Sequence, residues 1–193
     1  MGKGRLEAFF DAVVAVAITI MVLELKPPHG AEPAELLGAL PIFLSYILSF
    51  IYIGIYWVNH HHFYYLVHKI SGGMLWANLH LLFWLSLIPF TTGWMGENHF
   101  AMWPVVVYAL NLLACAIAYT IMSFVAVGVH GAGSDVAKAV GRDKKGKISL
   151  VIYLLSLPLA FINPMLSCAC FVAVALIWFI PDRRIERVMG AGV

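Results

Sequence analysis

Charged residues are scarce in this chain. Asp, Glu, Lys and Arg make up 11% of its 193 residues, against about 25% in a typical soluble domain. Hydrophobic residues account for 62% of the sequence, and the mean hydropathy is +0.89. This composition excludes an ordinary soluble domain and predicts a membrane protein.

Paired cysteines and catalytic signatures are also missing. The three cysteines, Cys115, Cys168 and Cys170, form no C-x-x-C pair, and an odd number gives no complete disulfide framework. We expect them to be small core residues. The chain contains no Walker loop, no H-E-x-x-H, no G-x-S-x-G and no TVGYG filter. These absences favour a protein that is not an enzyme and has no cofactor.

Long apolar segments, by contrast, are abundant. Crossing a bilayer as a helix takes about 20 apolar residues, and six spans are predicted, at about 8–25, 37–67, 73–95, 102–128, 148–164 and 165–181. Asn163 and Pro164 are a turn signal between the last two. The polar stretch 131–147 is expected to be a loop. Residues 1–193 are therefore predicted to form one all-α, six-helix transmembrane domain.

The basic residues predict the orientation of these spans. With the N-terminus in the cytoplasm, Lys26 is the one basic residue outside, and the other eleven of the twelve are inside. The positive-inside rule therefore predicts that both termini are cytoplasmic. Membrane lipids are expected partners, because the tail arginines Arg183, Arg184 and Arg187 suit anionic headgroups. Nucleic acid is not an expected partner.

Polar residues of the first three spans are predicted to share one depth near the cytoplasm. At about 1.5 Å per helical residue, this layer holds Arg5, Asp11, Asn59, His60, His61, Asn78 and His80. Ionisable groups inside a membrane normally pair or face water. The layer is consistent with three readings: a staple between helices, a metal or haem site, or a proton-coupled or metal-handling transporter that uses His60, His61 and His80.

An aliphatic stripe follows on the first span. Val16, Ile20 and Leu23 recur at helical spacing, and Thr19 lies beside them. Ordinary helix packing produces the same periodicity, as a purely structural membrane subunit would show. A pore also fits, if several copies of this helix meet on a symmetry axis and the aliphatic rings gate it by dewetting.

Three motifs resemble one known family. Arg5-x-x-x-Phe9-Phe10-Asp11 with the following Ala-x-x-Ala-x-Ala-Ile-Thr resembles the R-x-x-x-F-S-D signature of the lysosomal potassium channel family named transmembrane protein 175 and its prokaryotic homologues. Trp57-x-x-His60-His61-x-Phe63 resembles that family's second helix. The segment from Asn78 to Phe90 resembles its third helix. The chain length is that of a prokaryotic member with one six-helix unit.

The resemblance implies a homotetrameric potassium channel in the prokaryotic plasma membrane, weakly selective for potassium over sodium. It places four copies of the first helix around a central pore, with a constriction at Val16, further lining at Ile20 and Leu23, and Thr19 associated with potassium preference. The implied supporting network is Arg5, Phe9, Asp11, Trp57, Asn59, His60, His61, Asn78 and His80.

The sequence departs from the family pattern at one motif position. Phe10 stands where the family has serine, so we expect a bulky ring in place of a hydroxyl near the pore mouth and altered hydrogen bonds there. Val16 is also shorter than the isoleucine or leucine common at the constriction, which predicts a slightly wider and leakier ring.

Overall fold

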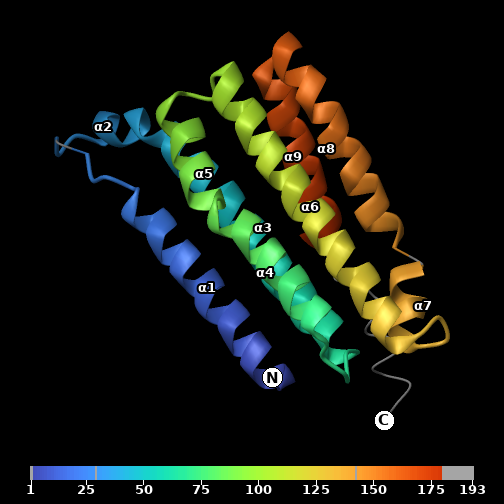
Figure 1. Cartoon of the computed structure of the whole chain (residues 1–193). Coiled ribbons are helices and arrows are strands. Elements are labelled where there is room, and N and C mark those ends of the chain that lie inside the picture. The colour runs from blue at the N-terminus through green and yellow to red at the C-terminus, as the bar shows by residue number, and fades with distance from the viewer. Residues whose placement is uncertain (1, 29, 142, 180–193) are drawn as a thin grey trace.

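The chain folds into a bundle of long, roughly aligned helices. The computed structural model describes residues 2–28, 30–141 and 143–179, and every regular element in these ranges is a helix (Figure 1). The elements are α1 (Lys3–Leu23), α2 (Pro33–Gly38), α3 (Leu40–Tyr65), α4 (Gly72–Ser86), α5 (Ile88–Glu97), α6 (Met102–His130), α7 (Asp135–Gly141), α8 (Lys144–Ile162) and α9 (Pro164–Phe179).

Five helical stretches are long and apolar enough to cross a membrane. They are α1, α3, the pair α4 and α5 taken together, α6 and α8. Over the described residues α9 is a shorter apolar helix of 16 residues. Residues 180 and 181 of the predicted last span lie outside the described residues, as do the three arginines of the tail. The sixth span therefore stays a prediction.

The structure differs from the expected segments at two places. The span 73–95 is divided into α4 and α5, since Pro89 has no N–H to donate to the Leu85 carbonyl one turn earlier. The polar stretch 131–147 is not a plain loop, because it contains α7 and the first turn of α8. Ser134 Oγ accepts from Ala137 N at 3.1 Å, and Asp143 Oδ1 accepts from Gly146 N at 2.9 Å. These caps start the two helices.

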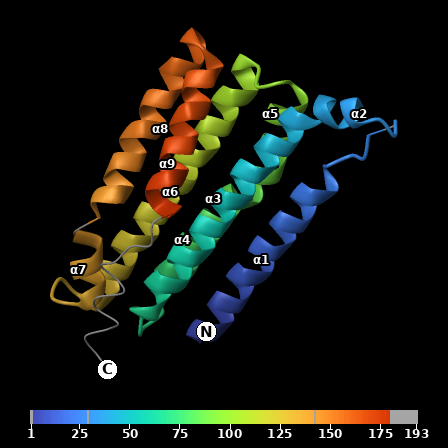
Figure 2. The same ribbon diagram turned by 180° about the vertical axis from the view of Figure 1, so that it is seen from behind.

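α1 lies at one edge of the bundle. It is the outermost long helix in Figure 1 and again in the reverse view of Figure 2, and it packs against α3, α4 and α5. The α8–α9 hairpin packs on the other side of the bundle, against α6, and α9 also contacts α3. α3 and α6 contribute to both hydrophobic cores, so they connect the edge helix to the hairpin.

Short polar side chains bond between helices within the apolar interior. Ser49 Oγ on α3 lies 2.8 Å from Tyr108 Oη on α6, and Thr92 Oγ1 on α5 donates to Ser49 Oγ at 2.6 Å. Each group is buried, and together they satisfy hydroxyls that would otherwise lack a partner in lipid. This cluster fixes the register of the three helices.

Gly96 lies where α5 packs tightly against α3 and gives a prediction about stability. A Cβ at this position would lie 2.8 Å from Ile42 Cα and would also meet Ser45 Oγ. Gly96→Ala should therefore lower the free energy of unfolding by about 1–3 kcal/mol through overpacking. Gly54→Ala on α3 is the control, because a Cβ there meets no atom within 4 Å. Thermal unfolding of both variants in detergent measures the difference, and equal melting temperatures would refute the close contact.

Candidate pore helix and its support

α1 has one face buried in the bundle. The buried residues recur every three or four positions, as one side of a helix requires, and they are Leu6, Phe10, Val14, Ala17 and Met21. They pack into the core formed with α3, α4 and α6. This face fixes which side of α1 is left uncovered.

The predicted lining residues lie on the uncovered side. Val16 is 56% exposed, Ile20 44% and Leu23 74%. Thr19 is exposed beside them, and its Oγ1 donates to the Ala15 carbonyl at 2.8 Å. Because the hydroxyl proton is used within the helix, the oxygen lone pairs face outward as acceptors. An apolar row with one acceptor oxygen per chain therefore runs along the free face.

The buried face of α1 is held by a stack of rings around His60. The His60 side chain on α3 is 2% exposed. Its ring lies 3.5 Å from the Phe10 ring, centroid to centroid, with an angle of 7° between the planes, and 4.3 Å from the Tyr64 ring. His60 Nε2 lies 2.9 Å from Asn78 Oδ1 on α4 and donates to it. One imidazole thus joins α1, α3 and α4.

Phe10 corrects the expectation based on the missing serine. Its side chain is fully buried and turned away from the row that carries Val16, so no bulky ring enters the uncovered face. Motif comparison alone did not identify Phe10 as a support residue. The available signal was its spacing from Leu6 and Val14, four residues on either side, which places all three on one side of the helix.

A second contact joins α1 to α3 nearer the surface. Trp57 Nε1 donates to Asp11 Oδ1 at 2.9 Å. Both residues are exposed in the single chain. This charge-assisted bond satisfies one oxygen of a carboxylate that lies two turns into α1.

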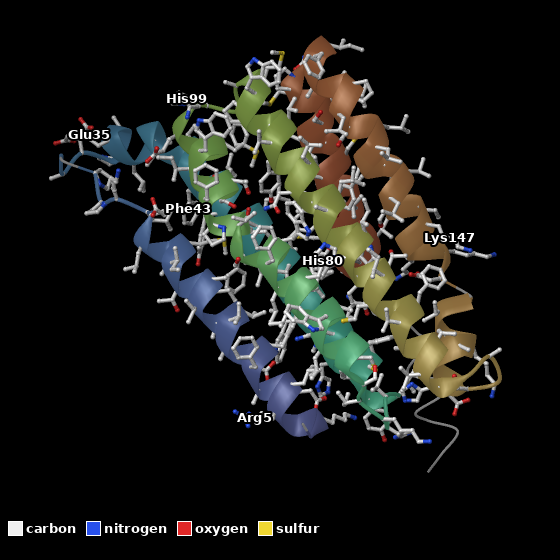
Figure 3. The ribbon with its side chains drawn as sticks, viewed as in Figure 1. Arg5, Glu35, Phe43, His80, His99 and Lys147 are labelled. Atoms are coloured by element: carbon white, nitrogen blue, oxygen red, sulfur yellow. The ribbon has the colours of Figure 1, made fainter. Side chains whose placement is uncertain are left out.

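The other predicted network residues are not brought into this contact set. Asn59 Nδ2 donates within its own helix to the Ile55 carbonyl at 2.7 Å. His80 is exposed on α4 and accepts from Trp84 Nε1 at 3.0 Å. Arg5, Phe9 and His61 are exposed, and Figure 3 shows Arg5 at the outer edge of the bundle. The structure therefore does not join these residues into a single network. It contains a buried His60–Asn78 pair and an exposed Asp11–Trp57 pair, and the other predicted residues lie apart from both.

This arrangement does not assemble metal ligands. His60 is engaged with Asn78, the His61 ring contacts that of His62, and His80 contacts Trp84. Within residues 2–28, 30–141 and 143–179, no group of three or more His, Cys, Asp or Glu side chains could hold a metal ion.

The His60–Asn78 pair gives a prediction about stability. Asn78→Ala should leave the buried Nε2–H of His60 without an acceptor, which costs about 1–3 kcal/mol in soluble proteins. Hydrogen bonds between membrane helices average about 0.6 kcal/mol, so we expect a loss of about 1 kcal/mol. Asn98→Ala is the control, since the exposed Asn98 side chain donates its hydrogen bond locally, to the Trp94 carbonyl one turn away. A loss no larger than the control, measured by thermal unfolding in detergent, would contradict the role of the pair.

Comparisons with known proteins agree with the motif resemblance. The family model described as "Endosomal/lysosomal potassium channel TMEM175" matches residues 5–89, which include α1 from Arg5 onward, the His60 stack and the α4–α5 break. A protein of Chryseobacterium sp. (strain P1-3), named a potassium channel, is 52% identical over 187 residues, covering 97% of each chain.

More distant relatives extend this comparison. The crystal structure of a lysosomal potassium-selective channel TMEM175 homolog from Chamaesiphon minutus has a TM-score of 0.80 at 29% identity, covering 92% of this chain and 96% of that one. The human protein named endosomal/lysosomal proton channel TMEM175 is 30% identical over 101 residues, which are 46% of this chain and 20% of that protein. These relatives are ion channels and not enzymes. The chain belongs to the TMEM175 family.

Proposed function

We propose that this protein is a potassium-permeable cation channel, formed by four copies with α1 around a central axis. The observation that carries the proposal is the uncovered apolar face of α1, which bears Val16, Ile20 and Leu23 at 44–74% exposure. Relatives that match nearly the whole chain are named or described as potassium channels. The proposal assigns the same permeant ion to this chain.

The edge position of α1 supports assembly around it. A helix at the rim of a bundle, with an exposed row on the side away from its own chain, can face the same row of other copies across a cyclic axis. Ala8, Ala12 and Ala15 are exposed on the adjoining side, and small residues let helix backbones approach closely in membranes. The tetrameric state remains part of the proposal.

The narrowest ring is proposed at Val16. Four valine side chains at one level form an apolar constriction that resists wetting, so ions pass when the ring is wide enough to hold water. Ile20 and Leu23 continue the lining toward the end of α1. One hydroxyl from Thr19 per chain offers few oxygens to a dehydrated ion, which is the reason to expect only weak preference for potassium over sodium.

The proposed orientation keeps both ends of the chain in the cytoplasm of a prokaryotic cell, with the plasma membrane as the location. It is supported by the basic residues of the sequence and by the position of the N-terminus at the same end of the bundle as α7 (Figure 1). In this orientation His60, Asn78 and the Asp11–Trp57 pair support the cytoplasmic half of the pore helix.

The constriction can be tested with a polar substitution at Val16. Val16→Asn should raise cation flux, because a polar ring is easier to wet; lowering the barrier by about 1.4 kcal/mol gives a gain on the order of tenfold. Val22→Asn is the matched control, since Val22 is also exposed on α1 but points away from the row of Val16 and Ile20. Unchanged flux in a correctly assembled Val16→Asn protein would show that Val16 is not the gate.

The Thr19 hydroxyl gives a separate prediction about selectivity. Thr19→Val keeps the shape but removes the acceptor oxygen, so the potassium-to-sodium permeability ratio should fall toward one. Thr19→Ser keeps the hydroxyl and should retain the ratio. Reversal potentials under bi-ionic conditions measure both. An unchanged ratio in Thr19→Val would assign selectivity to other groups.

The decisive experiment for the function is ion flux in proteoliposomes that contain the purified protein. A potassium gradient alone should drive flux that is faster than sodium flux under matched conditions and absent from empty vesicles. Saturable, pH-dependent transport abolished by His60 or His80 substitutions would instead indicate the transporter alternative. No flux from a verified tetramer would refute the channel proposal as stated.

A further inference from the structure

A groove between α6, α7 and α8 is not used by the proposed pore. It lies away from α1, at the end of the bundle where α7 packs, and its cavity volume is about 80 Å³. That is several times the 10–15 Å³ that one water requires. Its lining contains both polar and apolar side chains.

The uncharged polar part of the lining comes from two helices. Asn59 on α3 and Thr120 and Ser123 on α6 lie along its inner wall. The hydroxyl protons of Thr120 and Ser123 are donated to carbonyls one turn earlier, at 2.8 and 2.9 Å. The groove therefore offers a band of polar groups behind its rim.

The apolar part faces sideways from the bundle. Phe124 on α6 is 63% exposed, and Leu150 on α8 borders the same groove. Both helices are long and apolar enough to span a membrane, so an exposed phenylalanine on their outer surface meets acyl chains. The groove therefore opens toward lipid as well as toward water.

One lysine and one aspartate line the groove at the start of α8. Lys147 lines the groove on α8, and Figure 3 shows it on the outer side of the bundle. Lys144 and Lys145 precede it in the same turn, with no acidic residue in that turn. Lysines at a helix N-terminus oppose the helix dipole, and the exposed Lys147 adds a positive charge at the groove that can pair with an anion. Asp143 in the rim accepts from Gly146 N and caps α8.

An aromatic residue of the kind found at membrane interfaces borders the groove. Trp178 on α9 borders the groove, donates from Nε1 to Ser149 Oγ at 2.8 Å, and lies 5.8 Å from Lys145 Nζ. Tryptophan and lysine together are typical of the headgroup level. Basic grooves between transmembrane helices at that level bind anionic lipid headgroups.

We propose that one anionic phospholipid binds in this groove, with its phosphate at Lys147 and an acyl chain over Phe124 and Leu150. The lipid would hold α7 and α8 against α6. The proposal requires a membrane boundary at this end of the bundle and does not depend on the pore.

The test uses the full chain, purified and delipidated in detergent, and thermal unfolding titrated with phosphatidylglycerol or phosphatidylcholine. We expect phosphatidylglycerol to stabilise the protein more than phosphatidylcholine does. Lys147→Ala should raise the half-saturating concentration of phosphatidylglycerol about fivefold, because one basic residue near a membrane surface contributes about that much to binding. Lys147→Arg should retain binding.

Lys138→Ala is the matched control. It removes the same charge from the neighbouring helix α7. Lys138 is outside the groove and bonds to Asp135 Oδ1 at 2.8 Å, which lowers the pKa of Asp135. Ala139→Phe keeps all charges and narrows the groove that Ala139 lines, so it should also reduce the stabilisation. If Lys138→Ala and Lys147→Ala weaken phosphatidylglycerol binding equally, the lipid responds to general surface charge and the proposed binding in the groove is refuted. Full stabilisation by inorganic phosphate alone would refute a lipid ligand.

Discussion

The arrangement of the first helix depends on satisfying one buried imidazole. His60 is a polar ring in an apolar interior, where an unpaired N–H is costly. The structure meets this demand with Asn78 on α4 and covers the two faces of the ring with Phe10 and Tyr64. Because Phe10 belongs to α1, the rotation of that helix is coupled to the same contacts, and the outward direction of Val16 follows from them.

The sequence predicted the helical class and the five long apolar stretches that the described residues contain, since hydropathy over 20 residues is a strong signal. It also predicted that Val16, Ile20 and Leu23 share a face, because that depends only on helical spacing. It did not predict the division at Pro89 or the short helix α7. Those features depend on a single proline and on the capping side chains Ser134 and Asp143, whose effect is local.

The contacts between polar residues were the least predictable part of the site. Depth in the membrane placed Asn59, His80 and His60 together, but depth does not specify direction around a helix. Asn59 and His80 turn to partners on their own helices, at Ile55 and Trp84. A hydrogen bond within one helix needs no tertiary arrangement, so a polar residue in a span often takes it. Only the direction of each Cβ in the folded bundle separates the two outcomes.

The rim position of α1 has a consequence for how the protein comes into being. The inner face of α1 is covered by helices of the same chain, whereas the exposed row with Val16 can be covered only by other chains in the proposed tetramer. A newly inserted single copy then has a finished fold but no enclosed path for ions. Synthesis can proceed one chain at a time without dissipating the membrane potential, and leakage begins only when the last copy closes the ring.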